Sequence, residues 1–198
     1  MTSLADFGTA TIHEASGQKG ALPSSIKPLV AGMRVYGPAF PVRSPGGDNL
    51  MLHAAILGAP KGSIIVADAG FESEAGPWGD LMTLSAMQKG IAGLVISGSV
   101  RDGDDIARYG FPVFCTGQCI RGTTKKMKGP APDTVRIGEV TIAPGDIIVG
   151  DNDGLVVVDA NMVRTVTEAC HKREEKEASF RSRMEAGESL QSIMGLVL

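Results

Sequence analysis

The middle of the chain alternates short, continuous apolar runs with segments that have helical spacing. The apolar runs are residues 63–68, 93–97 and 111–115, each of strand length. Between them, residues 81–89 and 104–110 have the spacing and end signals of short helices. Strands that are apolar on both faces and joined by helices form parallel sheets, because the helices cover the sheet. This alternation predicts an α/β fold with a partly parallel sheet flanked by helices.

The flanking segments add further elements, and we find no repeat or linker that would separate them into a second domain. The β-rich part, with a hairpin signal at Asp153-Gly154, is therefore expected to pack on the α/β part as a second layer. We predict one domain over residues 1–198. Its further elements are a helical segment within 1–20, a bent strand over 34–43, a helix over 50–57 capped by Asp48 or Asn49, hairpin-rich β structure over 134–159, and a helical segment over about 160–198.

Charge and composition narrow the classes of partner. The net charge of −3 gives no general attraction for nucleic acid or anionic lipid. No apolar run approaches the roughly 20 residues of a membrane span, and the N-terminal residues show no signal-peptide pattern. The three cysteines are too few and odd in number for a disulfide framework. We expect a cytoplasmic protein that binds neither nucleic acid nor membranes.

Charged residues cluster around the apolar run at 93–97. Arg101 and Asp102 follow that run, and Asp105 comes shortly after them. Asp80 begins the helix that precedes it. Ligands of open α/β folds bind at the carboxyl ends of the strands, so we predict that these four side chains form the active site.

The residue types in this cluster favour one kind of chemistry. Aspartates are hard oxygen ligands that suit Mg²⁺ or Mn²⁺, and an arginine offers a permanently charged fork to an anionic oxygen. The turn at Gly79 leaves the amides of Leu81 and Met82 free to hold a carboxylate. These parts suit a 2-oxo acid whose cleavage passes through an enolate. The alternative interpretation is a capped helix with a surface salt bridge.

A family resemblance supports the catalytic interpretation. The chain resembles the RraA-like family, which contains the regulator of ribonuclease activity A and the class II aldolases of 4-hydroxy-4-methyl-2-oxoglutarate and 4-carboxy-4-hydroxy-2-oxoadipate. The resemblance rests on landmarks that cover nearly the whole chain in order. They are Pro45-Gly-Gly-Asp-Asn-Leu50, Val66-Ala-Asp-Ala-Gly70, Trp78-Gly-Asp-Leu81, Gly90-Ile-Ala-Gly93, Gly98-Ser-Val-Arg-Asp102, Gly110-Phe-Pro-Val-Phe114, Gly145-Asp-Ile-Ile-Val149 and Asp151-Asn-Asp-Gly-Leu-Val156.

The aldolase branch of that family is marked by an aspartate, twenty residues, Arg-Asp, two residues and an acidic residue, a pattern that Asp80, Arg101, Asp102 and Asp105 complete here. The resemblance implies that Asp102 binds the metal and that Asp105 supports it through water. It implies that Arg101 contacts the substrate and that Asp80 orients a water for proton transfer. It also implies a swivelling β/β/α fold in homotrimers or homohexamers, with sites at subunit interfaces.

Some charged residues outside this cluster are further candidates. Glu14 and the acidic run at 174–177 could reach a neighbouring subunit's site, where related enzymes use glutamates, or could simply be solvated. A basic loop could meet the distal carboxylate of a dianionic substrate or could be an exposed loop. Its cations are Arg121, Lys125, Lys126 and Lys128. His53 and His171 are interpreted as structural.

Two functions remain open on the sequence. The first is a metal-dependent lyase that releases pyruvate from a small 2-oxo acid, with oxaloacetate decarboxylation as a possible side activity through the same enolate. The second is a non-catalytic regulator that binds and inhibits a ribonuclease. A methyltransferase lacks support, because no Gly-rich cofactor turn follows an early strand.

Overall fold

The computed structural model describes residues 3–45, 47–127, 129 and 134–197. Helices and strands alternate through most of the chain. In order they are η1 (Leu4–Asp6), α1 (Thr9–Ala15), β1 (Lys27–Pro28), β2 (Val35–Arg43), α2 (Leu50–Gly58), β3 (Ile64–Asp68), α3 (Asp80–Gln88), β4 (Gly93–Ile96), β5 (Ser99–Val100), α4 (Gly103–Tyr109), β6 (Val113–Cys115), β7 (Gly117–Gln118), β8 (Val135–Ile137), β9 (Val140–Ile142), β10 (Ile147–Gly150), β11 (Leu155–Val158), η2 (Ala160–Met162), α5 (Val163–Glu185) and α6 (Leu190–Met194).

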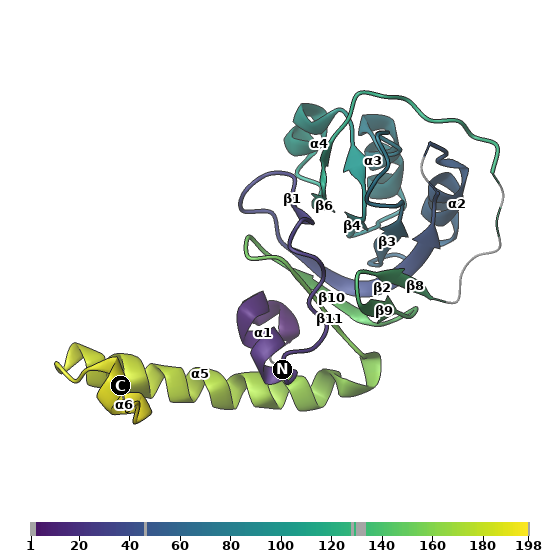
Figure 1. The fold of residues 1–198 in the computed structure, drawn as a ribbon. Coiled ribbons are helices and arrows are strands. Elements are labelled where there is room, and N and C mark those ends of the chain that lie inside the picture. Colours follow the sequence, from purple (N-terminus) through teal and green to yellow (C-terminus); the bar gives the residue numbers. More distant parts are fainter. Residues whose placement is uncertain (1–2, 46, 128, 130–133, 198) are drawn as a thin grey trace.

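One mixed sheet of seven strands organises the molecule (Figure 1). Its order is β1-β6-β4-β3-β2-β10-β11. Strands β2, β3, β4 and β6 are parallel, with helices in the connections between them. The strand β10 runs antiparallel to both β2 and β11, and β1 runs antiparallel to β6 at the other edge. The sheet is therefore parallel in its middle and antiparallel at both ends.

The two faces of the sheet are covered by different elements. Side chains of one face, such as Ile65 and Leu94, pack in one cluster with residues of α2, α3 and α4. The neighbouring positions Ile64 and Val95 point to the opposite face, because side chains alternate along a strand. There they meet Val135 and Ile142 of the β8–β9 hairpin.

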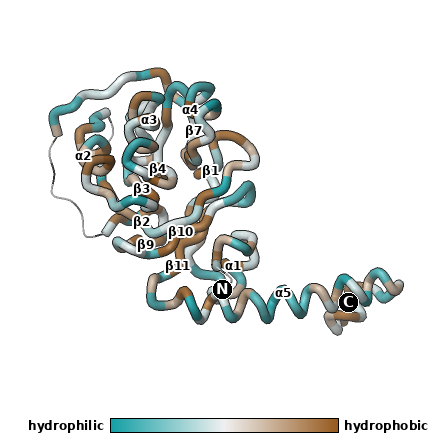
Figure 2. The backbone as a smooth tube through the Cα atoms, turned by 180° about the vertical axis from the view of Figure 1, so that it is seen from behind, coloured by the Kyte–Doolittle hydropathy of each residue, from teal (hydrophilic) through white to brown (hydrophobic). Residues whose placement is uncertain are grey.

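The antiparallel end of the sheet has its own helical cover. Val149 and Val156 pack with Ile12 of α1 and with Val166 and Cys170 of α5. The long helix α5 then runs out beyond this contact (Figure 1), and hydrophilic residues dominate its length (Figure 2). Figures 1 and 2 agree that α1 and α5 lie at the opposite end of the molecule from α3 and α4.

The predicted α/β class and the partly parallel sheet flanked by helices are confirmed, with differences in detail. Of the described strands in the predicted β-rich segment, β8 and β9 form a separate layer, whereas β10 and β11 join the main sheet. The N-terminal helix is shorter than the predicted segment, because Gly8 precedes it and Gly17, at φ +69°, follows its end. The strand β1 was not predicted, and its Pro28 lies on an edge, where a missing N–H is tolerated.

Within the described ranges, no helix combines the length and the apolar character needed to cross a bilayer.

Candidate active site

A short ribbon beyond the end of β4 positions Arg101. Strand β5 pairs in parallel with β7, and the Cys119 amide donates to the Val100 carbonyl at 2.8 Å. On the other side, the Arg101 amide donates to the carbonyl of Trp78, also at 2.8 Å. The Trp78 side chain is fully buried. The backbone of Arg101 is thus held between β7 and the segment that leads into α3.

Asp102 has an unusual backbone conformation. Its φ of +56° and ψ of +38° lie in the left-handed region, which aspartate tolerates better than most residues but which still stores strain. From this turn its carboxylate faces the start of α3. The Oδ2 atom accepts from the Asp80 amide at 3.3 Å and lies 3.5 Å from Arg101 Nε. The structure therefore brings Asp80, Arg101 and Asp102 together, as the sequence predicted.

Gly79 allows this close approach. A Cβ atom at Gly79 would lie 2.4 Å from Asp102 Oδ2 and 3.2 Å from Arg101 Nε. Gly79 is the N-cap of α3 and has no side chain to cap the first-turn amides. Its carbonyl accepts from the Thr83 hydroxyl at 3.0 Å, and that hydroxyl accepts from Trp78 Nε1 at 2.8 Å. The start of α3 is thus fixed, while the amides of Leu81 and Met82 remain available.

Asp105 lies one turn further along the chain. Its amide donates to the Asp102 carbonyl at 3.1 Å, and its carboxylate forms an ion pair with Arg108 on the same helix. Within the described residues, no three His, Cys, Asp or Glu side chains are grouped closely enough to hold a metal ion. A site for hydrated Mg²⁺ needs only one or two carboxylates, because the ion keeps several waters. The donor chemistry at Asp102, with Asp105 close by, therefore fits such an ion.

A small cavity adjoins these side chains. Its volume is about 110 Å³, below the range of drug-sized ligand sites and suited to a small organic acid. The lining includes every residue predicted to bind substrate, together with Asp80 and four residues outside the predicted cluster. The lining residues are Asn49, His53, Pro77, Gly79, Asp80, Leu81, Met82, Arg101 and Lys125.

Two polar side chains of this cavity have buried atoms that lack a hydrogen-bond partner among the described residues. They are Asn49 Oδ1 and His53 Nε2. The other amide atom of Asn49, Nδ2, donates to the Pro77 carbonyl at 2.8 Å. Because that carbonyl can only accept, Oδ1 is the acceptor left over. Burial, together with the nearby charge of Lys125, lowers the pKa of His53, so the imidazole is neutral at pH 7.

The sequence did not place Asn49 and His53 in the lining of the cavity, and it left Lys125 open between an exposed loop and a contact with the distal carboxylate. Asn49 was interpreted as a helix cap and His53 as structural. The N-cap of α2 is Asn49, but its side chain makes no capping hydrogen bond. A polar residue at a cap position inside the Pro45–Leu50 motif was the one signal that could have placed Asn49 in the site.

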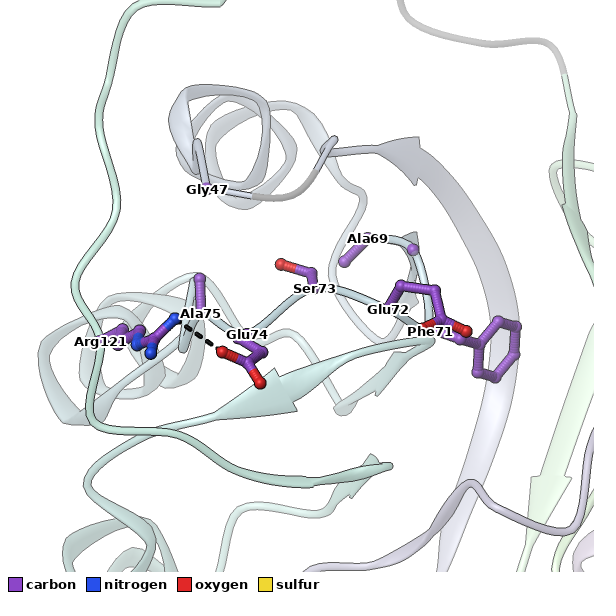
Figure 3. Close-up of a pocket in the computed structure, with 9 residues that line it drawn as sticks. Gly47, Ala69, Phe71, Glu72, Ser73, Glu74, Ala75 and Arg121 are labelled. Carbon is purple, nitrogen blue, oxygen red and sulfur yellow. Dashed lines mark hydrogen bonds and ion pairs between the residues drawn. The ribbon is translucent and has the colours of Figure 1, made fainter.

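Two cationic side chains of the basic loop lie at different hollows. Arg121 lies at a separate, larger hollow of about 570 Å³, where its Nη1 is 2.6 Å from Glu74 Oε2 (Figure 3). Glu72 also lines that hollow, so its acidic rim does not favour an anionic ligand. Lys125 instead lines the small cavity. Lys128 lies outside the described residues.

Glu14 is not brought to this site within one chain. It lies on α1, where it forms an ion pair with Arg173 of α5 at 3.7 Å. Both helices are at the other end of the molecule from α3 (Figures 1 and 2).

Comparisons with known proteins agree with this architecture. The profile of the family described as "RraA-like: Aldolase/RraA" matches residues 9–157. A protein of Halalkalibacterium halodurans named "Putative 4-hydroxy-4-methyl-2-oxoglutarate aldolase" is 34% identical over 88% of this chain and 83% of its own length.

Two solved structures are similar over most of the chain. One, an uncharacterized protein from Pseudomonas syringae, superposes with a TM-score of 0.83 at 30% identity and covers 94% of this chain and 88% of its own. The other is Streptomyces coelicolor RraAS2, described as an unusual member of the RNase ES inhibitor RraA protein family. It superposes with a TM-score of 0.78 at 27% identity, over 90% of this chain and 93% of its own.

Proposed function

Because this chain belongs to the RraA-like (Aldolase/RraA) family, we propose that it is a divalent-metal-dependent, class II aldolase. Its proposed substrates are acids of the 4-hydroxy-4-methyl-2-oxoglutarate or 4-carboxy-4-hydroxy-2-oxoadipate type, cleaved to pyruvate and a second oxo acid. One observation carries the proposal. The Asp102 carboxylate, the Arg101 guanidinium and the first turn of α3 meet at a cavity sized for a small acid.

Asp102 is the proposed direct metal ligand, and Asp105 the proposed support through water. Asp102 Oδ2 already contacts the Asp80 amide and Arg101, whereas Oδ1 takes part in no hydrogen bond or ion pair in the described part of the chain. When bound there, Mg²⁺ or Mn²⁺ would supply a Lewis acid for the keto group.

The chain's own groups bind and orient the rest of the substrate. The Leu81 and Met82 amides at the start of α3 hold the carboxylate next to the keto group, since a helix N-terminus favours an anion. Gly79 leaves room for that approach. Asp80 holds the water that takes the proton of the 4-hydroxyl group. As the C3–C4 bond breaks, its electron pair forms the enolate of pyruvate, and C4 becomes a carbonyl carbon. Return of the proton from the water to C3 of the enolate then gives pyruvate. Arg101 meets the negative charge that grows on the enolate oxygen.

The same enolate arises when carbon dioxide leaves oxaloacetate, so oxaloacetate decarboxylation is the proposed side activity. The deciding measurement is pyruvate release from 4-hydroxy-4-methyl-2-oxoglutarate and from oxaloacetate, with added Mg²⁺ and with excess chelator. We expect release that depends on the metal. Full activity in chelator would contradict the metal-dependent mechanism.

A homotrimer or homohexamer with sites at subunit interfaces is the proposed assembly. Glu14 offers a test of this assembly. If Glu14 takes part in catalysis, it must come from a neighbouring subunit, since within one chain it pairs with Arg173 away from Asp102.

A regulator that binds and inhibits a ribonuclease is the alternative, favoured by the likeness to Streptomyces coelicolor RraAS2. Ribonuclease inhibition measured with wild type and with Asp102→Asn separates the two functions. A regulator would inhibit without releasing pyruvate, and an aldolase would lose pyruvate release in the variant.

A further inference from the structure

The small cavity has a cation that the proposed chemistry at Asp102 does not use. Its charged lining residues are Asp80, Arg101 and Lys125. Arg101 lies 3.5 Å from Asp102 and faces the reacting end of the substrate. Lys125 comes from the segment between β7 and β8, which is distant in sequence from both α3 and α4. Its presence in the cavity therefore needs a structural cause.

Asp48 supplies that cause. Its side chain is buried, with 3% of its surface exposed. Its Oδ2 accepts from the Thr124 hydroxyl at 2.6 Å and from the Lys126 amide at 2.7 Å, and its Oδ1 accepts from the Leu50 amide at 3.0 Å. The two residues on either side of Lys125 are thus tied to the start of α2.

Backbone hydrogen bonds add to these side-chain contacts. Together they form a clamp that holds residues 124–126 against the start of α2. The Asn49 amide donates to the Thr124 carbonyl at 3.0 Å, and the Thr124 amide donates to the Gly47 carbonyl at 2.8 Å. The Thr124 hydroxyl, helped by the amides of Lys126 and Leu50, holds the pKa of Asp48 well below its usual range. The clamp is therefore charged and intact at neutral pH.

The neighbours of Lys125 in the cavity suit an oxygen-rich ligand. Asn49 Oδ1 is a buried acceptor without a partner among the described residues, on a residue only 5% exposed. His53 is neutral and contributes no competing positive charge. A hydroxyl group can donate to Asn49 Oδ1, and a carboxylate can pair with Lys125. This side of the cavity therefore matches a hydroxylated chain that ends in a carboxylate.

We propose that Lys125 is the residue that selects dicarboxylates, by pairing with the carboxylate of the substrate distal to the keto group, and that Asp48 positions it. This inference rests on the proposed function and names the residue behind its substrate class. Arg121 does not serve this purpose, since it is paired with Glu74 at the neighbouring hollow. A 4-hydroxy-2-oxo acid with a single carboxylate would leave the Lys125 ammonium group without a partner on the substrate.

Substrate preference tests the proposal. Values of kcat/KM are measured for 4-hydroxy-4-methyl-2-oxoglutarate and for the monocarboxylate 4-hydroxy-2-oxopentanoate. We expect Lys125→Met to lower kcat/KM for the dicarboxylate about tenfold, mainly through KM, because a charge pair with substrate is lost. The value for the monocarboxylate should stay within about twofold. Lys126→Met is the matched control, as it removes the same charge from the next residue but keeps the backbone amide that Asp48 holds.

The positioning role of Asp48 has its own test. Asp48→Asn should lower the preference for the dicarboxylate as Lys125→Met does. The double variant should be no worse than either single one, since both changes act through the same contact. Additive losses would show that Asp48 acts by another route.

A binding measurement tests the role of Lys125 without depending on catalysis. Calorimetry of 2-oxoglutarate and of pyruvate in the presence of Mg²⁺ should show weaker binding of 2-oxoglutarate to Lys125→Met and unchanged binding of pyruvate. If wild type cleaves no substrate but this difference appears, the aldolase proposal fails and the Lys125 site stands. Equal losses for both ligands, or the same loss in Lys126→Met, would overturn the role of Lys125.

Discussion

The two ends of the molecule use the same charged residue types in opposite ways. Next to β5, Arg101 and Asp102 direct their charges at the start of α3. Along α5, arginines and glutamates pair one turn apart on the exposed helix surface, as Arg164 does with Glu168. Helix geometry brings such pairs together without strain. Asp102 instead needs a left-handed backbone. Backbone strain accompanies the charges that point at a cavity, which is typical of functional sites.

The largest expected effect comes from removing the charge of Asp102. Asp102→Asn should lower kcat on the order of 10³-fold, because the proposed metal ligand and its transition-state stabilisation are lost together. Asparagine tolerates the left-handed region, so the melting temperature should change little. Glu168→Gln, which removes an exposed α5 carboxylate that pairs with Arg164, is the control and should leave kcat unchanged. If Asp102→Asn kept full activity, Asp102 would have no catalytic role, and the proposed functional difference between the two ends of the molecule would be wrong.

Arg101 tests whether charge develops during the reaction. Arg101→Ala should depress kcat on the order of 10²-fold, with a smaller change in KM, because the guanidinium stabilises the forming enolate. Arg101→Lys keeps the charge but loses the fork and should fall between wild type and Arg101→Ala. A higher KM with unchanged kcat would instead assign Arg101 to ground-state binding.

Two glycines sharpen the comparison between the ends. Gly79→Ala places a Cβ against Asp102 Oδ2, and we expect kcat to fall on the order of tenfold because catalytic geometry shifts. Gly20 lies at φ +83°, and a Cβ there would be 2.1 Å from the Val157 carbonyl oxygen. Gly20→Ala should lower the free energy of unfolding by about 2 kcal/mol or more and leave kcat unchanged. Denaturant titrations measure the free energy of unfolding, and initial rates measure kcat. A loss of kcat in Gly20→Ala, with unchanged kcat in Gly79→Ala, would contradict the assignment of Gly79 to the active site and of Gly20 to stability.

Mixing variant subunits tests whether the α1 end of one subunit contributes to the active site of the next. If the α1 end of one subunit completes the site of the next, Glu14→Ala should be impaired on its own. Mixing it in equal amounts with Asp102→Asn should then restore about one quarter of the wild-type sites by random pairing in a closed ring. Full activity of Glu14→Ala alone would leave Glu14 with only its ion pair to Arg173.

The smallest expected effect is on stability against pH. Burial lowers the pKa of His53 in the folded protein below the ordinary 6.5. The unfolded chain therefore binds the proton more readily, and the free energy of unfolding should decrease as pH falls below 6.5, down to the folded-state pKa. His53→Gln should flatten this slope in urea titrations between pH 7 and pH 5. An unchanged slope would show that other groups cause it.

The sequence predicted the parallel strands and helices because each has its own local pattern, such as the apolar run at 93–97. It also placed Asp80, Arg101 and Asp102 together, since strand ends converge. The left-handed turn at Asp102 has no local signal, because the sequence offers aspartate where glycine is usual. Lys125 was left open for a different reason. The segment that carries it has no periodicity, and its position depends on the long-range contacts of Asp48.

The burial of Trp78 has a spectroscopic consequence. It is the only tryptophan in the chain, and its carbonyl and indole both take part in fixing the segment around Arg101 and α3. Selectively excited fluorescence therefore reports on the environment of this one segment. Far-ultraviolet circular dichroism, by contrast, has its largest single helical contribution from the 23 residues of α5. When both signals are recorded during one thermal melt, they follow the unfolding of the two ends of the protein separately.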